Sequence, residues 1–360
     1  MRAAFAGGGS AGHLSPALAI AQRFLRQAPE AEALFFGAKK PLDEKLLAPY
    51  NHRLLSATGL PYGLSPKMVI GLIRMAQGSM EAMNAMRAWR PQVIVGTGGY
   101  ISAAAVPAAT MQGIPAVIHA SDAMPDRSGL KLAASAARIT VAFEAAAEHF
   151  PADKVVVTGQ PVREEVLQGD RESARAARGY APDDVVLFVT GGSQGARTLN
   201  TAALGAAAGL LGKGMKIYHQ TGALEFPRVQ AEAQERKLGP GYVCADYEMN
   251  MAEALAAADV IVMRAGSSSL AEATAWGLPM IVVPYPHAHG HQKVNAAELE
   301  RKGAALVIDD ERFGPETLSE TVTDLLEHAD KRQAMSQAAL SWGSREAAQK
   351  IAALVIEVAR

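Results

Sequence analysis

The chain has 360 residues, of which 49% are hydrophobic and 33 are glycine, and this composition excludes disordered and fibrous proteins. The formal net charge is −1, but residues 1–158 carry 15 Lys and Arg against 10 Asp and Glu, whereas the remainder carries 20 against 26. This asymmetry fits either scattered solvated charge or an anionic partner of the basic half, such as a lipid surface or nucleic acid. The single cysteine, Cys244, excludes an intramolecular disulfide, and no apolar run reaches the roughly 18 residues of a spanning helix. We therefore expect a cytoplasmic protein that at most touches a membrane.

One structural unit recurs four times along the chain. A short apolar run, a turn rich in Gly or Ser and a helical pattern follow one another at residues 3–13, 93–109, 185–200 and 260–277. This alternation predicts parallel sheets whose functional loops follow the carboxyl ends of the strands. The sequence thus predicts an α/β fold of two doubly wound, Rossmann-like domains facing each other across a cleft.

The domain junction is expected near residues 158–162, where a short strand leads into a Gln-Pro turn and a charged helix. The predicted bounds are 1–158 for an N-terminal domain and 159–340 for a C-terminal domain. An amphipathic helix within 341–360 can pack back on the N-terminal domain.

The first loop contains Gly7, Gly9 and Gly12 in the spacing G-x-G-x-x-G, which is a weak signature of dinucleotide binding. That function also requires an acidic residue about 20 positions later, at the end of the second strand. The segment "ALFFGAKK" ends there in lysines, which disfavours NAD, although NADP could still be argued. His13 follows the glycines and is placed either to take a proton from a hydroxyl or to cap and pack the helix.

Two further segments have competing interpretations. The histidines at 287, 289 and 291 suggest a metal site, but the neighbouring prolines and glycine favour an ordinary loop. The segment 64–90 combines apolar Met68, Val69, Leu72 and Ile73 with basic Lys67, Arg74, Arg87 and Arg90. It is either a core-packed helix or an apolar patch with a basic rim that docks on an anionic membrane surface.

Five segments together resemble the bacterial MurG-type transferases. They are "GGGSAGHLSPALAIA", "GTGGYISAAAVPAA", "GQPVREEV", "TGGSQGARTLN" and "RAGSSSLAEATAWGLPMIVVPYPHAHGHQKVNAAELE". The resemblance is collinear over nearly the whole chain and implies the two-domain GT-B fold. It also implies the family's reaction, in which N-acetylglucosamine (GlcNAc) moves with inversion from UDP-GlcNAc to the C4 hydroxyl of undecaprenyl-pyrophosphoryl-MurNAc-pentapeptide, converting lipid I to lipid II. The N-terminal domain would take the acceptor and the C-terminal domain the donor.

The resemblance implies a role for individual residues, with His13 as the catalytic base. UDP-GlcNAc would be bound by Ser10, Ala11, Gly12, Asp122, Arg163, Ser193, Glu248, Ser267, Ser268, Ser269, Glu272, Gln292 and Asn295. Within that set, Arg163 and Ser193 would serve the pyrophosphate and uracil, Ser267, Ser268 and Ser269 the phosphates, Glu272 the ribose, and Gln292 and Asn295 the sugar. The acceptor would be bound by Gly98, Gly99, Tyr100 and His119, with Ser10, Ala11 and Gly12 beside its pyrophosphate.

No cofactor is expected. The sequence has no Asp-x-Asp pair to hold a metal ion, so backbone amides, helix N-termini and Arg163 would stabilise the charge that develops on UDP.

One segment departs from the family pattern. The family usually reads His-Glu-Gln-Asn with a later Asn, whereas this chain retains His119 but has Ala120, Ser121, Asp122 and Gly129. Asp122 can stand in for the missing amide or signal a changed acceptor preference. In the first loop, Ser10 and Ala11 replace the usual Thr and Gly, a milder change that keeps a hydroxyl.

Three alternatives remain open from sequence. The chain could be another GT-B transferase acting on a lipid acceptor, such as a diacylglycerol glycosyltransferase, or a UDP-GlcNAc 2-epimerase. It could also be a catalytically silent scaffold of the division machinery that binds a nucleotide sugar. The expected partners are UDP-GlcNAc, lipid I, the anionic inner leaflet of the cell membrane, and cell-wall or division proteins, with no nucleic acid. The expected location is peripheral, on the cytoplasmic face of that membrane.

Overall fold

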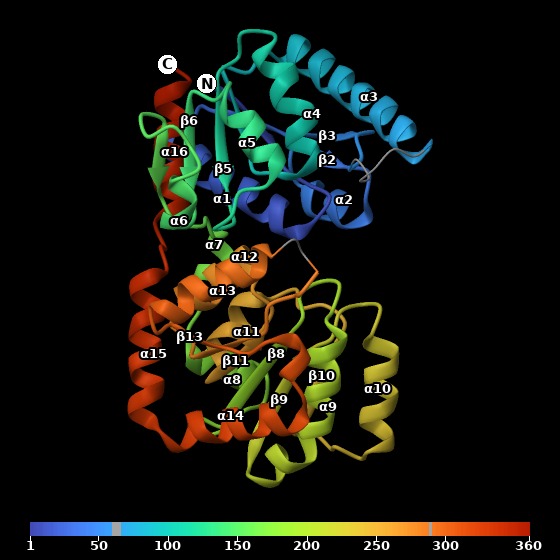
Figure 1. The fold of residues 1–360 in the computed structure, drawn as a ribbon, viewed down its shortest axis with the longest axis vertical. Coiled ribbons are helices and arrows are strands. Elements are labelled where there is room, and N and C mark those ends of the chain that lie inside the picture. Colours follow the sequence, from blue (N-terminus) through green and yellow to red (C-terminus); the bar gives the residue numbers. More distant parts are fainter. Residues whose placement is uncertain (60–65, 288–289) are drawn as a thin grey trace. The chain divides into compact units, whose positions relative to one another are not determined.

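The computed structural model describes residues 1–59, 66–287 and 290–360, except for the side chains of residues 11 and 127. It forms two compact units, which are drawn in Figure 1. Unit 1 comprises Met1–Arg163 together with Arg345–Arg360, and unit 2 comprises Glu164–Ser344. Each unit has its own parallel sheet and its own core, which confirms the predicted α/β class and the two doubly wound sheets.

In the described residues, the sheet of unit 1 has seven strands, all parallel, in the order β3-β2-β1-β4-β5-β6-β7. The strands are β1 (Arg2–Ala6), β2 (Glu32–Ala38), β3 (His52–Leu55), β4 (Val93–Gly96), β5 (Ala116–Ala120), β6 (Arg138–Val141) and β7 (Val155–Val157). The helices are α1 (Ala11–Gln27), α2 (Pro41–Leu47), α3 (Pro66–Trp89), α4 (Gly99–Thr110), α5 (Arg127–Ala133), α6 (Glu144–Ala147) and α16 (Ala347–Val358).

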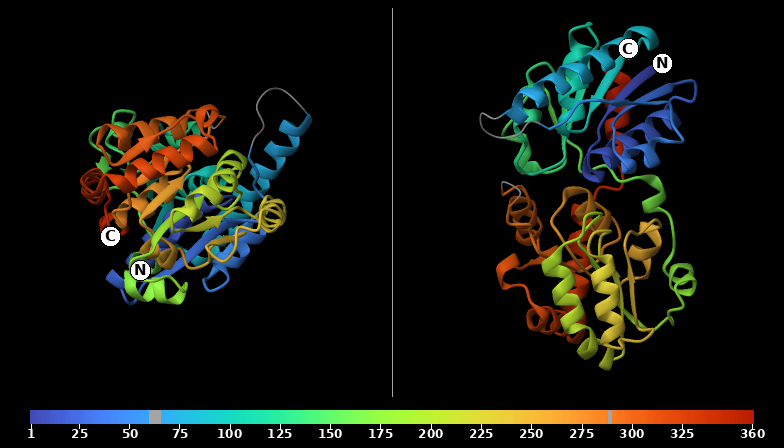
Figure 2. Two further views of the ribbon diagram at one scale, coloured as in Figure 1. Left: turned by 90° about the horizontal axis from the view of Figure 1, so that it is seen from below. Right: turned by 90° about the vertical axis from the view of Figure 1, so that its right-hand side faces the viewer.

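Alternate residues of β1 explain how the helices divide over the two faces of this sheet. Ala4 and Ala6 pack in one core with α3 and α4, whereas Ala3 and Phe5 pack in another with α1 and α16. The right-hand view of Figure 2 shows α3 and α4 on one face and α16, in red, on the other. The last helix of the chain thus completes the core of unit 1 beside α1.

In the described residues, the sheet of unit 2 has six parallel strands in the order β10-β9-β8-β11-β12-β13. The strands are β8 (Val185–Thr190), β9 (Met215–Gln220), β10 (Tyr242–Ala245), β11 (Val260–Met263), β12 (Met280–Val282) and β13 (Ala305–Val307). The helical segments are α7 (Glu164–Leu167), α8 (Arg171–Ala177), α9 (Arg197–Gly212), α10 (Phe226–Glu235), α11 (Met251–Ala257), α12 (Ser267–Ala275), α13 (His291–Arg301), η1 (Asp310–Arg312), α14 (Pro315–Glu327) and α15 (Ala329–Trp342).

Each sheet has one point where the strand order reverses. In unit 1 this point lies between β1 and β4, where Ala6 pairs with Gly96, and in unit 2 it lies between β8 and β11, where Thr190 pairs with Met263. Ligands of doubly wound folds bind in the crevice beyond the carboxyl ends of the strands at such a point. The four recurring loops of the sequence follow these four strands, so two of them flank the reversal in each unit.

The long helix α3 exposes the apolar side chains that the sequence left ambiguous. The exposed fractions of Val69, Leu72 and Ile73 are 59%, 51% and 54%, so their packing into the core is excluded. The helix instead packs through another face, on which Ala82 and Met86 are buried in the core. It approaches the chain closely at Gly78, where an added Cβ atom would lie 2.7 Å from the backbone nitrogen of Ala57. Although α3 is long, no helix among the described residues combines the length and hydrophobicity needed to cross a membrane.

Candidate functional site

The first loop of unit 1 leads into α1, whose first turn places His13 at the reversal point between β1 and β4. Ser10 is the extended N-cap of α1, and its hydroxyl lies 3.0 Å from Nδ1 of His13 in the first turn of that helix. The backbone carbonyl of His13 accepts a 2.7 Å hydrogen bond from the Thr97 hydroxyl at the end of β4. Burial lowers the pKa of His13, and the carboxylates of Asp122, Asp126 and Asp43 partly oppose this effect. A neutral imidazole with one nitrogen held by Ser10 can accept a proton at the other.

The loop after β4 packs directly against this histidine. Gly98 and Gly99 have φ angles of +100° and +71°, and a Cβ at either position would approach the His13 ring within 2.9 Å. Tyr100 packs against the first loop at Gly9, since a Cβ there would lie 2.5 Å from its hydroxyl. The residues of this loop that the sequence assigned to the acceptor therefore lie in contact with the first loop.

Two charged side chains from the region of α2 hold Gly9, and sequence reasoning missed both roles. The buried carboxylate of Asp43 accepts hydrogen bonds from the backbone N–H groups of Gly9, at 2.9 Å, and Ala38, at 2.8 Å. The Lys40 ammonium donates to the carbonyl of the same Gly9 at 2.7 Å. A search for an acidic residue at the end of the second strand overlooked Asp43 because it comes five residues after that strand ends, inside the next helix.

His119 is enclosed by the strands that carry it. Its side chain is 1% exposed, and its ring nitrogens lie 3.0 Å from the Thr140 hydroxyl and 2.8 Å from Oε1 of Gln160. Burial lowers its pKa to about 4, so the ring is neutral at pH 7. Both nitrogens are thus engaged inside unit 1, while Asp122 is half-buried just beyond the same strand.

In unit 2, the loop after β8 is shaped by backbone contacts rather than by charged side chains. Gly195 has a φ angle of +79°, and a Cβ there would lie 2.2 Å from the carbonyl oxygen of Thr221. The N–H of Gly192 donates to the Thr190 hydroxyl at 3.1 Å. Ser193 is half-buried in the middle of this loop.

The loop after β11 leads into α12, and two amide side chains of α13 hold it. Oε1 of Gln292 accepts from the N–H of Ala265 at 3.2 Å, and Nδ2 of Asn295 donates to the carbonyl of the same residue at 3.1 Å. Asn295 is fully buried, whereas Gln292 is half-buried. The serines and the acid assigned to the donor begin the helix that follows; Ser267 is buried, and Ser268, Ser269 and Glu272 are half-buried.

Glu248 and Arg163, both assigned to the donor, lie outside these two loops. The Glu248 carboxylate accepts from Arg178 at 2.7 Å, from the Tyr218 hydroxyl at 2.5 Å and from the N–H of Asn250 at 2.5 Å. It therefore ties the segment after β10 to the rest of unit 2. Arg163 is half-buried at the last residue of the first segment of unit 1.

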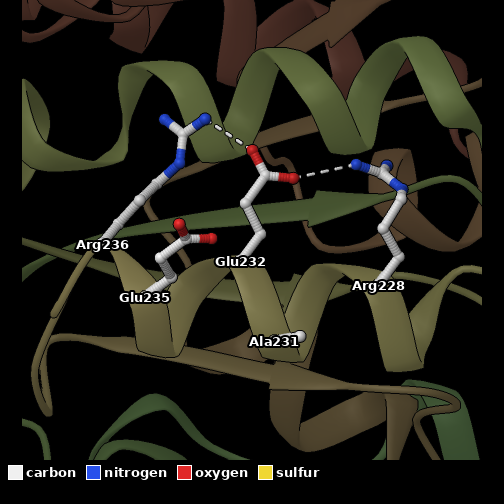
Figure 3. Close-up of a pocket in the computed structure, with 5 residues that line it drawn as sticks. All are labelled: Arg228, Ala231, Glu232, Glu235 and Arg236. Carbon is white, nitrogen blue, oxygen red and sulfur yellow. Dashed lines mark hydrogen bonds and ion pairs between the residues drawn. The ribbon is translucent and has the colours of Figure 1, made fainter.

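A surface pocket lies elsewhere, along α10 of unit 2. Figure 3 shows Glu232 between Arg228 and Arg236, with its carboxylate paired to both at 3.1 Å and 2.5 Å. These ion pairs join residues one turn apart on the exposed face of one helix, an arrangement that stabilises a helix. None of the residues predicted from sequence lines this pocket.

The metal interpretation of the histidine segment gains no support from the described part of the chain. There, no three His, Cys, Asp or Glu side chains are grouped as metal ligands would be. One of the three histidines, at position 289, lies outside the described residues.

Comparison with known proteins identifies relatives of the whole chain. Residues 3–140 match the model of the glycosyltransferase family 28 N-terminal domain, and residues 186–355 match that of its C-terminal domain. The UDP-N-acetylglucosamine--N-acetylmuramyl-(pentapeptide) pyrophosphoryl-undecaprenol N-acetylglucosamine transferase of Desulforudis audaxviator is 37% identical, with 100% of this chain and 99% of that protein aligned.

Two solved structures bear on the fold. MurG of Acinetobacter baumannii superposes with a TM-score of 0.74 at 25% identity, over 99% of both chains. The UDP-GlcNAc 2-epimerase of Neisseria meningitidis bound to UDP-GlcNAc has a TM-score of 0.70 at 14% identity, over 99% of this chain and 100% of its own. The second likeness concerns the fold alone, so the fold by itself does not separate a transferase from an epimerase.

Proposed function

The chain belongs to glycosyltransferase family 28, and from that premise we propose that it transfers GlcNAc from UDP-GlcNAc to the C4 hydroxyl of undecaprenyl-pyrophosphoryl-MurNAc-pentapeptide. The observation that carries this proposal is the 37% identity, over the whole chain, to a transferase named for this reaction. Unit 1 would bind the lipid-linked acceptor, and unit 2 would bind UDP-GlcNAc.

In the proposed reaction, His13 is the general base. The acceptor C4 oxygen attacks the anomeric carbon of GlcNAc, the bond from that carbon to the UDP oxygen breaks, and the hydroxyl proton passes to the imidazole. The Ser10 hydroxyl beside Nδ1 leaves Nε2 to take the proton. The lowered pKa supports this role, because it keeps the ring unprotonated at neutral pH.

The donor would be held by the two loops at the reversal point of unit 2. Backbone N–H groups at the start of α12, together with Ser267, Ser268 and Ser269, would face the diphosphate as negative charge builds on UDP. The Glu272 carboxylate would accept from the ribose hydroxyls. Arg163 and Ser193 complete the proposed diphosphate and uracil contacts.

The hydrogen bonds of unit 2 divide the remaining donor residues by role. Gln292 would reach the sugar while holding Ala265, whereas the buried Asn295 would act by positioning that loop. Glu248 would act in the same indirect way, through the segment that it fixes. In unit 1, His119 would act by holding Gln160 rather than by direct contact with the acceptor.

The lipid carrier of this acceptor requires a membrane, and we propose α3 as the docking surface. Val69, Ile70, Leu72 and Ile73 are each more than half exposed near the start of this helix. Exposed apolar patches of this kind mark interaction sites, and the neighbouring Lys67 and Arg74 would favour an anionic leaflet. The protein would then lie on the cytoplasmic face of the cell membrane, where cell-wall or division proteins would be its partners.

Vesicle co-sedimentation tests the docking surface. Lys67→Glu combined with Arg74→Glu should weaken binding to anionic vesicles, and Ile70→Ser combined with Ile73→Ser should weaken binding to neutral ones as well. Arg312→Glu, an exposed charge reversal in unit 2, is the matched control. Undiminished binding of both double variants would show that the protein binds the membrane through a surface other than α3.

Incubation with UDP-GlcNAc and a short-chain lipid I analogue tests the function. We expect stoichiometric UDP and disaccharide product, with negligible UDP release when the acceptor is omitted. Epimerisation of the sugar, hydrolysis without transfer, or transfer to diacylglycerol instead would each overturn the proposal in favour of the corresponding alternative. Binding of UDP-GlcNAc without turnover would indicate a silent scaffold.

A further inference from the structure

We propose that Asp43 is a positioning residue for the transfer reaction, which fixes the turn at Gly8 and Gly9 and thereby holds the loop that leads into α1, whose first turn carries His13. This inference rests on the proposed function for its catalytic consequence. Its structural part, the control of the first loop by Asp43, stands independently of the reaction. No motif of the sequence pointed to this residue.

The geometry around Asp43 is that of an internal anion in a glycine-rich loop. Its side chain is fully buried, and one carboxylate oxygen, Oδ2, accepts both the Gly9 and the Ala38 N–H groups. The other oxygen, Oδ1, is also buried and has no hydrogen-bond partner among the described residues. A Cβ at Gly8 would lie 2.3 Å from Oδ2, so the loop can approach the carboxylate only because that residue is glycine.

Asp43 accepts from a backbone N–H group that would bind a phosphate in a dinucleotide-binding fold. There, the amides of the glycine-rich turn point at the pyrophosphate of the cofactor. Here the Gly9 amide already donates to the carboxylate of the protein itself. The glycines of the G-x-G-x-x-G spacing thus allow a turn that Asp43 fixes. The Asp43 carboxylate binds the amide that would otherwise bind the phosphate of a ligand.

The turn links Asp43 to both candidate catalytic loops. Lys40 holds the carbonyl of Gly9, its ammonium lies 5.9 Å from the centre of the Tyr100 ring, and that ring in turn covers Gly9. Ser10 follows Gly9 directly and carries the hydroxyl that meets His13. Loss of the hydrogen bond between Gly9 and Asp43 would therefore increase the mobility of both Ser10 and Tyr100.

The experiment compares Asp43→Ala and Asp43→Asn with Glu44→Gln, which removes an exposed carboxylate from the adjacent residue. Asparagine can still present one oxygen to the two N–H groups but lacks the charge, so Asp43→Asn keeps the proposal testable if Asp43→Ala fails to fold. The first measurement is amide hydrogen exchange of peptides covering residues 6–13 and of peptides from the rest of unit 1. The second is the pair of KM values for the lipid acceptor and UDP-GlcNAc, together with kcat.

We expect exchange at residues 6–13 to accelerate roughly ten- to a hundredfold in Asp43→Ala, as befits the loss of hydrogen bonds to a charged group, and less in Asp43→Asn. The acceptor KM should rise about tenfold or more and kcat should fall, with the donor KM changed less than about twofold. Exchange that is unchanged, or that rises equally throughout unit 1, would overturn the proposal, as would equal changes in both KM values. If the wild-type protein transfers no GlcNAc, the proposed function fails, while the exchange measurement still decides whether Asp43 controls the loop.

Discussion

In each unit, side chains hold the backbone of one loop at the reversal point of the sheet, and the chemistry of these side chains differs between the units. In unit 1, the N–H and carbonyl of Gly9 are bound by a carboxylate, Asp43, and an ammonium, Lys40. In unit 2, the N–H and carbonyl of Ala265 are bound by two neutral amides, Gln292 and Asn295. Both residues belong to loops that flank the reversal point of their sheet, after β1 and after β11.

The difference matches the work proposed for each loop. A full negative charge beside a leaving diphosphate would oppose the charge that develops there, and neutral amides avoid this cost. In unit 1, burial lowers the pKa of His13, and the charge of Asp43 opposes this effect together with the charges of Asp122 and Asp126, which act more strongly. Of the side chains that hold these two loops, the charged ones accordingly lie in the unit that we propose for proton transfer, and the neutral ones lie in the unit that we propose for the nucleotide sugar. The predictions below test this division.

The largest effect is expected at His13. His13→Gln should lower kcat by about 10²- to 10⁴-fold, the usual contribution of a general base, while leaving UDP-GlcNAc binding nearly intact. Because burial lowers its pKa, the unprotonated base persists below pH 6.5, so the acid limb of kcat/KM in the wild-type protein should lie below that pH. Kinetics between pH 5 and 8 provide the measurement. An acid limb that survives unchanged in the variant would assign the base to another residue.

The glycine loop of unit 2 should respond to steric change rather than to charge. In Gly195→Ala, the new methyl group would overlap the Thr221 carbonyl, from which it would be separated by 2.2 Å, and the φ of +79° would be strained. We expect a loss of about 3 kcal/mol or more in unfolding free energy, together with weaker UDP binding. Gly192→Ala is the matched control, since its φ is +78° but no atom of the described part of the chain lies within 4 Å of the added Cβ, and it should cost only about 1 kcal/mol of unfolding free energy. Urea unfolding and UDP titration measure these effects. Equal losses of unfolding free energy and of UDP affinity in the two variants would mean that backbone strain, and not the contact with Thr221, causes them.

Gln292 and Asn295, the two amide side chains that hold Ala265, should govern donor binding independently of pH. Asn295→Ala removes a buried hydrogen bond to the Ala265 carbonyl, so we expect about 1–3 kcal/mol of destabilisation and a UDP-GlcNAc KM raised about tenfold. The acid limb should stay where it is, because no charge near His13 changes. Lys293→Ala, on the exposed side of the same helix, breaks only a surface ion pair with Asp309 and should change little. A shift of the acid limb in Asn295→Ala would break the division between the two units.

Sequence reasoning predicted the fold because the two-domain pattern is local. Each βα unit combines an apolar strand with a turn and a helix, and these patterns can be recognised in a short stretch of sequence without knowledge of tertiary contacts. The family resemblance placed residues 10–12 and 98–100 together at the acceptor, and in the structure the two loops follow neighbouring parallel strands. The MurG-type motifs added the reaction.

The roles of individual side chains could not be predicted in this way. Asp43 reaches Gly9 only because α2 folds back over the end of β2, and nothing in the spacing of the sequence announces that contact. Asn295 and His119 stand in conspicuous motifs, yet their side chains turn inward to backbone and side-chain partners. A motif shows that a residue matters, whereas only packing distinguishes a residue that would touch the substrate from one that positions its neighbours.

The last prediction concerns two buried histidines, His119 on β5 of unit 1 and His219 on β9 of unit 2. Burial lowers the pKa of His119 in unit 1 to about 4, and burial together with Arg228 lowers that of His219 in unit 2 to about 3. The unfolded chain takes up these protons near pH 6.5, well before the folded protein does. Stability should therefore fall as the pH drops below 6.5, by up to about 1.4 kcal/mol per pH unit for each histidine, until its folded pKa is reached.

Urea unfolding of His119→Gln between pH 7 and 4.5 should show a shallower pH dependence than the wild-type protein, at some cost in stability at pH 7 from the lost hydrogen bonds. His149→Gln, an exposed histidine of the same unit, should leave the slope unchanged. His219→Gln should flatten the slope of unit 2 in the same way, because burial and Arg228 lower the pKa of His219 as burial lowers that of His119. If only one of the two histidines affected the slope, the two sheets would differ in their cores as well as in the loops that they carry.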